Sequence, residues 1–155
     1  MPQKPQWGRQ KYNEVAEHTL PITKEAKLAK AKRKFISLSE GEKTYSMSRA
    51  VVQGDWCFVS GTVGYNYATG ELPESAAQQT QNTFTNIMAA LKQAEFELGH
   101  TIRVQYTITD RKYIDEVLPV IKKHFGNILP AATMVIADLV DEKMKVEIEV
   151  TCFKG

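Results

Sequence analysis

The sequence contains few of the residues that are typical of disulfide-stabilised, metal-binding or redox proteins. Its 155 residues include only two cysteines, Cys57 and Cys152, and three histidines. The cysteines lie in apolar runs without the CxxC spacing of a redox or zinc site, so we expect two buried free thiols in a reducing compartment. Because the histidines are scattered along the chain, they form no metal-binding motif, and we expect neither a metal nor a cofactor.

Long hydrophobic runs are also absent. No stretch approaches the roughly 18–20 uninterrupted apolar residues that a membrane span requires. The N-terminus lacks the apolar block of a secretory signal, and its mixture of Glu and Lys is unlike a transit peptide. The sequence therefore predicts a cytoplasmic protein without membrane association.

The net charge of +2 is unevenly distributed. Residues 1–34 carry nine Lys or Arg and three Glu, a charge of +6, whereas residues 35–155 carry a charge of −4. The basic residues are densest from Lys24 to Lys34, where Thr23 can cap an Ala- and Lys-rich helix. A solvated helix or arm is favoured over a nucleic-acid contact, so we do not expect nucleic acid as a partner. We predict a basic N-terminal extension over 1–34 and a single domain over 35–155.

Hydropathy patterning within 35–155 predicts strands and two helices. A long helix begins near Glu74 and ends at Gly99; a second is capped by Asp110, contains Pro119 and ends at Gly126. The strands fall at 34–38, 49–53, 56–60, 102–109, 131–139 and 145–153. Residues at steps of three and four place an inward stripe on each helix: Ala77, Thr80, Phe84, Ile87, Leu91, Ala94 and Leu98 on the first, and Ile114, Val117, Leu118, Ile121 and Phe125 on the second.

Two helices are too few to cover both faces of such a sheet. We therefore predict an α+β two-layer sandwich, with a mixed sheet of about six strands and both helices on one face. The runs Trp56–Val59 and Thr133–Ala137 bring apolar groups to the uncovered face. An uncovered apolar face of that size usually meets another subunit, so an oligomer is expected.

An ordered set of short motifs resembles the RidA/YjgF family, historically labelled L-PSP endoribonucleases. The similarity runs in order over 35–155 and includes Ser48–Val51, Phe58–Gly61, Ala68–Glu71, Asn86–Ile87, Phe125–Gly126, Pro130–Ala131 and Lys145–Glu149. The resemblance implies a chorismate-mutase-like fold and a homotrimer with a barrel-like core and small-molecule pockets between subunits. It also implies a hydrolase that converts reactive enamines and imines to 2-oxo acids and ammonia. Some members are described as ribonucleases that inhibit translation.

The chain departs from the family at the site itself. The Arg that binds the substrate carboxylate in the family corresponds to Ala132, which Thr133 follows. The pocket Tyr corresponds to Met47, and the Asn of the second helix to Leu118. Ser60, Gly61 and Glu147 remain, and the resemblance makes Glu147 the catalytic candidate, a general acid or base. Since a forked Arg–carboxylate contact cannot be replaced by Ala, standard 2-imino-acid deaminase activity is not expected to carry over intact.

Another cation could stand in for the missing Arg. If residues 45–49 are extended, Tyr45, Met47 and Arg49 share one face and flank the cleft, which supplies a phenol and a guanidinium. The alternative is a surface Arg49 paired with an acidic neighbour. Glu147 and Glu149 also share a strand face, and burial in an apolar cleft would raise the pKa of the first.

Three functions follow from these observations. The first is hydrolysis of an imine-type metabolite that the usual Arg does not anchor. The second is a trimer that binds or senses a small metabolite without turnover. The third, ribonuclease activity, is disfavoured because residues 35–155 are negatively charged and show no basic aromatic platform.

Overall fold

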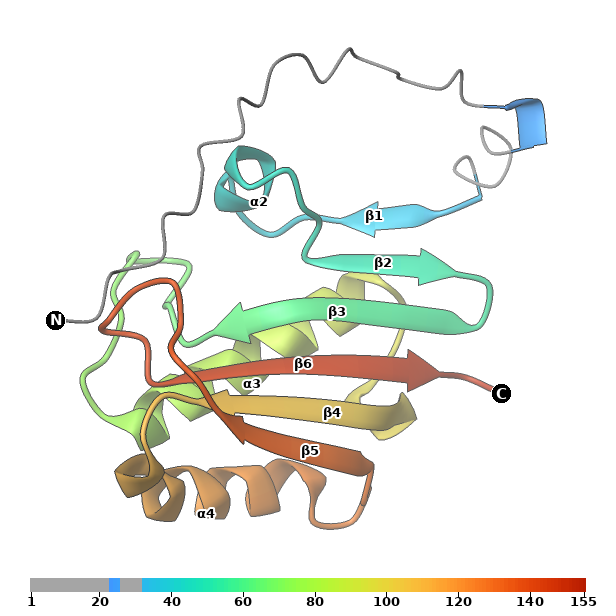
Figure 1. The fold of residues 1–155 in the computed structure, drawn as a ribbon. Helices are drawn as coiled ribbons and strands as arrows, with labels where there is room; N and C mark the ends of the chain where they lie inside the picture. The colour runs from blue at the N-terminus through green and yellow to red at the C-terminus, as the bar shows by residue number, and fades with distance from the viewer. Residues whose placement is uncertain (1–22, 26–31) are drawn as a thin grey trace, which may run out of the picture. The chain divides into compact units, whose positions relative to one another are not determined.

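The computed structural model describes residues 23–25 and 32–155, and Lys32–Gly155 form one compact unit (Figure 1). Lys24 and Glu25 are helical, as predicted, but most of the predicted basic helix lies outside the described residues. Lys34 begins the first strand, as the strand predicted at 34–38 requires. Among the described residues, no helix combines the length and apolarity that a bilayer crossing requires.

Six strands form one mixed sheet in the order β1-β2-β3-β6-β4-β5 (Figure 1). All neighbouring strands are antiparallel except β4 and β5, which are parallel. Helices α3 and α4 cover one face, whereas the short α2 lies near the β1 edge. This confirms the predicted two-layer α+β sandwich. The strands are β1 (Lys34–Ile36), β2 (Ala50–Gln53), β3 (Trp56–Val63), β4 (Thr101–Ile108), β5 (Ala131–Ile136) and β6 (Val146–Phe153); the helices are α2 (Gly41–Thr44), α3 (Ala76–Gln93) and α4 (Ile114–Phe125), with short 3-10 turns η1 (Leu98–His100) and η2 (Arg111–Tyr113).

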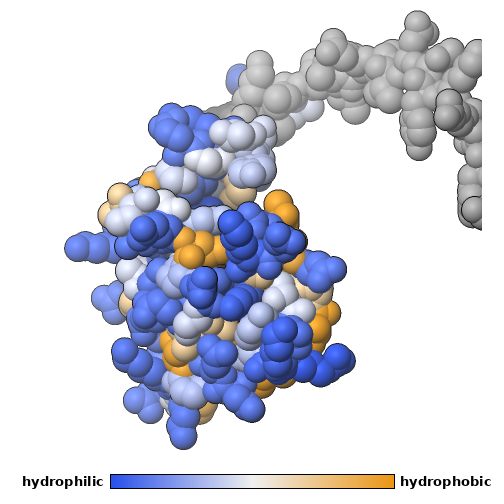
Figure 2. All heavy atoms as spheres, turned by 90° about the vertical axis from the view of Figure 1, so that its left-hand side faces the viewer, coloured by the Kyte–Doolittle hydropathy of each residue, from blue (hydrophilic) through white to orange (hydrophobic). Residues whose placement is uncertain are grey.

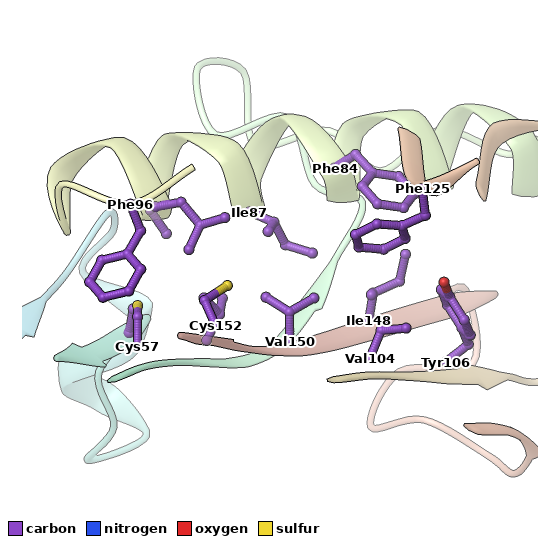
Figure 3. Packing of buried hydrophobic residues seen from close by; sticks show 14 of the residues in the cluster. Cys57, Phe84, Ile87, Phe96, Val104, Tyr106, Phe125, Ile148, Val150 and Cys152 are labelled. Carbon is purple, nitrogen blue, oxygen red and sulfur yellow. The ribbon is translucent and has the colours of Figure 1, made fainter. Parts of the chain in front are cut away.

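The core lies between α3 and the sheet (Figure 3). Alternate residues of β6, among them Ile148 and Val150, point toward Phe84 and Ile87 of α3, as strand and helix periodicities require. The centre of the predicted α3 stripe is therefore confirmed. On α4, Val117 and Phe125 are buried, but Leu118, predicted to face inward, is 46% exposed. Adjacent helical residues are about 100° apart, so burying Val117 turns Leu118 outward.

The two cysteines are free and buried, as predicted, and they are direct cross-strand partners. Burial and the neighbouring Cys152 thiol raise the pKa of Cys57 to about 12. Burial also raises the pKa of Cys152, so neither sulfur is a reactive thiolate near neutral pH.

Helix α3 ends earlier than predicted. Its stop is Glu95, which has a left-handed φ of 63°, and not Gly99. The Phe96 amide donates to the Leu91 carbonyl (2.8 Å) and the Glu95 amide to the Lys92 carbonyl (3.1 Å), the pattern of a Schellman motif. The buried Phe96 side chain follows Leu91 into the core, so a hydrophobic contact selects this ending over the glycine four residues later.

Replacing Glu95 by glycine is expected to stabilise the fold by about 0.5–1 kcal/mol, because glycine adopts a positive φ without a Cβ penalty. The exposed Lys34–Glu95 ion pair is lost, but such pairs contribute little. Thermal and urea denaturation measure the change. Glu97→Gly, at an ordinary extended φ of −124°, is the control and should not stabilise; equal effects of the two changes would contradict the expectation.

The second face of the sheet carries no helix and collects exposed aromatic rings. Trp56 (40% exposed) stacks on Phe58 (49% exposed), with ring centroids 6.1 Å apart, and contacts Phe153 at 4.6 Å. Phe35, on the edge strand β1, pairs with Val51 of β2 and is 50% exposed. Figure 2 shows hydrophobic atoms gathered along the right-hand margin, the side of this face.

Candidate functional site

The site candidates centre on an irregularity in β3. The pairing of β3 with β6 shifts between Val59 and Thr62, so that Ser60 and Gly61 together oppose Glu149. Such a bulge bends the strand and redirects its side chains, and bulges are common beside active sites. The Ser60 hydroxyl donates to the Ser48 carbonyl (2.8 Å) and holds the bulge against the preceding segment.

Glu147 lies directly against this bulge. A Cβ added to Gly61 would come within 2.6 Å of the Glu147 carboxyl carbon, so a side chain at position 61 would displace the carboxylate from its place against the bulge. The register pairs Glu147 with Val63 and Thr107, which places it on the sheet face without helices. Burial and the nearby Glu149 raise its pKa, while Arg49 acts in the opposite direction.

Arg49 and Glu42 form a buried ion pair next to Gly61. Arg49 Nε donates to Glu42 Oε1 (3.2 Å), and the two side chains are only 11% and 1% exposed. Arg49 Nη1 also donates to the Gly61 carbonyl (2.7 Å) and to Thr62 Oγ1 (3.1 Å). Burial acts to raise the pKa of Glu42, but hydrogen bonds from Ser39 and the charge of Arg49 outweigh it, so that pKa is lowered. The Glu42 carboxylate is therefore ionised, and it neutralises Arg49.

A cavity of about 650 Å³ opens beside this pair. Its lining comes from α2 and the segment after it, the segment after β3 and the loop before β6, which lie at the same end of the sheet in Figure 1. Arg49 and Glu42 form its charged end, with Asp141 as a further carboxylate. Tyrosine and methionine side chains supply much of the remaining wall. The lining comprises Ser39, Gly41, Glu42, Tyr45, Met47, Arg49, Val63, Tyr65, Asn66, Tyr67, Gly70, Val140, Asp141 and Met144.

Helix α3 fixes the tyrosine-bearing side of the cavity. The Asn86 side chain donates to the carbonyls of Val63 (3.2 Å) and Tyr65 (2.8 Å), and Asn82 donates to the Gly64 carbonyl (3.1 Å). Burial raises the pKa of the Tyr67 hydroxyl, with the Arg49 charge opposing and the Glu42 charge adding to the shift. The Tyr67 hydroxyl therefore lies within electrostatic reach of the ion pair.

The candidates from the sequence fall into separate groups. Tyr45, Met47 and Arg49 line the cavity, while Ser60 and Gly61 form the β3 bulge and Glu147 of β6 lies against it. Ala132 and Thr133 are exposed on the edge strand β5 and do not line this cavity. The register pairs Ala132 with Val104, a residue of the helix-covered face, so within one protomer Ala132 does not face Glu147.

The prediction that Tyr45, Met47 and Arg49 share one face of an extended segment is wrong. Residues 45–49 are not extended, because Tyr45 ends α2 and Ser46 has a φ of 53°. The turn, not strand alternation, brings the three side chains to one cavity. Arg49 does have an acidic partner, but the pair is buried and not at the surface.

Sequence reasoning missed Glu42, Tyr65, Tyr67, Asp141 and Met144. Glu42 stands in a short polar segment with no pattern that predicts burial. The alternation of Tyr65 and Tyr67 around Asn66, directly after a strand, is the one local signal that was available. Within residues 23–25 and 32–155, no group of three or more His, Cys, Asp or Glu side chains is arranged to hold a metal ion.

Residues 39–153 match the family model described as Endoribonuclease L-PSP. A RutC family protein of Aquifex aeolicus is 30% identical over 109 residues, which cover 69% of this chain and 87% of that protein. A 2-iminobutanoate/2-iminopropanoate deaminase of Dermatophagoides farinae is 26% identical and covers 66% of this chain and 80% of its own. The crystal structure of a member of the highly conserved YjgF family from Mycobacterium tuberculosis superposes with a TM-score of 0.71 at 32% identity, over 78% of this chain and 98% of the other.

Proposed function

The chain belongs to the endoribonuclease L-PSP family, the RidA/YjgF group, and from this premise we propose that it binds a small metabolite and hydrolyses its C=N bond. Glu147 is the proposed general acid and base. The observation that carries the proposal is the Glu147 carboxylate itself, half-buried against Gly61 and with a raised pKa. A carboxyl group with a pKa closer to neutrality can both give and take a proton.

The hydrolysis uses water and one proton relay. Protonated Glu147 gives its proton to the imine nitrogen, and the resulting carboxylate takes a proton from the attacking water. The water oxygen bonds to the imine carbon and gives a carbinolamine. Glu147, protonated again, then gives its proton to the amine nitrogen. As the C–N bond breaks, the carboxylate takes the hydroxyl proton, and ammonia or an amine leaves. The product is an aldehyde or ketone.

We propose a cytoplasmic homotrimer in which each site is completed by a neighbouring subunit. The exposed rings of Phe35, Trp56, Phe58 and Phe153 support this, since a contiguous apolar patch favours burial against another copy. Glu147 lies on the same sheet face, so association would enclose its carboxylate. Ala132 and Thr133, outside the protomer's cavity, would reach a site only across such an interface. The two free buried thiols suit a reducing compartment.

Ala132 gives a specific reason to weigh a second function, binding or sensing without turnover. The family's substrate-gripping Arg is absent there, so a 2-imino acid has no forked partner at that position. The basic residues 1–34 do not favour either catalysis or binding without turnover, because we propose them as an extension outside the domain of residues 35–155. The negative charge of that domain disfavours RNA as a substrate.

Imines generated in situ test the proposal. An amine oxidase supplies imines without a carboxylate and an amino-acid oxidase supplies 2-imino acids, while the carbonyl products are trapped. We expect the wild-type protein to hydrolyse the carboxylate-free imine faster than the 2-imino acid. Glu147→Gln should lower the rate of hydrolysis about 100-fold. Glu149→Gln, on the same strand face, is the matched control and should change the rate only severalfold. Ala132→Arg should raise the rate on 2-imino acids about tenfold. A wild-type rate equal to the uncatalysed rate for both imines would leave only the binding function.

A further inference from the structure

We propose that the cavity beside Arg49 takes an uncharged, ring-bearing ligand with one carbonyl-type acceptor, and that it rejects carboxylates. The inference rests on the proposed function. Glu147 does not line this cavity, but it lies against Gly61, whose carbonyl accepts from Arg49, so a ligand bound beside Arg49 is next to the proposed acid and base. Two observations support the inference: the formal charge of the residues that line the cavity, and the aromatic and thioether side chains of its walls.

The charged end of the cavity is not cationic. Glu42 Oε1 accepts from Arg49 Nε, and Glu42 Oε2 accepts from the Ser39 amide (2.6 Å) and hydroxyl (2.9 Å). With Asp141 the lining contains two carboxylates and one guanidinium, a formal charge of −1. A ligand carboxylate would leave water for a site whose only arginine is already neutralised, at a net desolvation cost. Arg49 therefore does not act as a relocated carboxylate anchor.

Arg49 nevertheless keeps donors for a ligand. Its Nε and Nη1 groups donate to Glu42, the Gly61 carbonyl and Thr62, but among the described residues none accepts a hydrogen bond from Nη2. Arg49 lines the cavity, so the two N–H bonds of Nη2 are the ones left for an occupant. A neutral carbonyl oxygen can accept from them without bringing a charge into the site.

The walls favour a flat apolar body. Tyr45, Tyr65 and Tyr67 and the thioethers of Met47 and Met144 line the cavity, and such side chains stack on or pack against rings. A volume of about 650 Å³ is in the range of pockets that hold one small organic ligand. An aromatic or alicyclic carbonyl compound, or the imine derived from it, meets both the wall and the donor.

Three probes of one shape and different charge test the inference: 2-naphthamide, 2-naphthoate and 2-naphthamidinium. Their binding to the wild-type protein is measured by calorimetry and by naphthalene fluorescence. We expect 2-naphthamide to bind at least tenfold more tightly than 2-naphthoate, because only the anion carries the desolvation cost. The amidinium should also bind more weakly than the amide, because it offers no acceptor to Arg49. Tightest binding of either ion, or no binding of 2-naphthamide, would overturn the inference.

Charge variants provide a second measurement. Glu42→Gln releases the guanidinium from its partner, and the ratio of 2-naphthoate to 2-naphthamide affinity should rise at least tenfold. If that variant does not fold, Asp141→Asn in the loop before β6 should move the ratio in the same direction by a smaller factor; an unchanged ratio would count against the inference.

Location variants place the probe in the cavity. Tyr45→Ala, at a side chain 72% exposed, should weaken 2-naphthamide binding about fivefold, whereas Leu118→Ala on the outer face of α4 should not. Equal effects would place the probe elsewhere. Because these experiments measure binding, absence of turnover in the imine assay rejects the catalytic proposal alone.

Discussion

Glu42→Ala is expected to lower the free energy of unfolding by about 3–5 kcal/mol, because it leaves the Arg49 guanidinium buried without its counter-charge. Arg49 also holds the Gly61 carbonyl and the Thr62 hydroxyl, so its displacement would disturb the β3 bulge as well. Urea denaturation followed by circular dichroism measures the loss.

Two comparisons make this prediction specific. Glu95→Gln, which breaks the exposed pair with Lys34, should change the free energy of unfolding far less than Glu42→Ala does. The double replacement Glu42→Leu with Arg49→Met should cost less than Glu42→Ala alone, since neither charge is then stranded. A loss below about 1 kcal/mol for Glu42→Ala would show that the pair does not support the fold.

The same pair predicts a pH dependence. The pKa of Glu42 is lower in the folded chain, so its contribution is complete above the ordinary carboxyl pKa. The contribution is lost as the pH falls through the lowered value. Glu147 has the opposite sign, because its pKa is raised and its ionisation opposes folding. Relative to the wild type, Glu42→Gln should therefore show a shallower loss of stability on acidification.

Gly64→Ala is the second large effect, with an expected destabilisation of about 3 kcal/mol. A Cβ at Gly64 would lie 2.4 Å from the Gln79 carbonyl oxygen and 2.5 Å from its Cα, both backbone atoms of α3. The helix cannot easily move away, because the Gln79 side chain fixes it. Gln79 Nε2 donates to the carbonyls of Pro73 (2.7 Å) and Lys143 (2.9 Å), and Gln79 Oε1 accepts from the Lys145 backbone amide (2.8 Å).

Gly99→Ala is the matched control, since a Cβ there meets no heavy atom within 4 Å, and its effect should stay within about 0.5 kcal/mol. Thermal melts of the two variants measure the difference. Gly64 begins the segment that carries Tyr65 and Tyr67, so Gly64→Ala should also weaken 2-naphthamide binding. Two melting temperatures equal to that of the wild type would contradict the close approach of α3 to β3.

The amino-acid sequence alone predicted the six strands, the helices α3 and α4 and their two layers, but not the short helix α2 that helps to line the cavity. Alternation along Val146–Phe153 and steps of three and four through Phe84, Ile87 and Leu91 depend only on neighbours in the chain, and burial follows from them. The aromatic residues of the run Trp56–Val59, left on the uncovered face, were equally visible in the sequence.

Only the tertiary structure decided the site. Glu42 is buried in an ion pair with Arg49, which is seven residues later in the chain. No local sequence pattern predicts that these two side chains pair. The ending of α3 at Glu95 depends on Phe96 reaching the core, although a glycine stands four residues further along. The cavity joins three segments distant in sequence, and its charge depends on which carboxylate reaches the guanidinium. Periodicity is a property of adjacent residues, whereas the pairing of charges is set by contacts that exist only after the chain has folded.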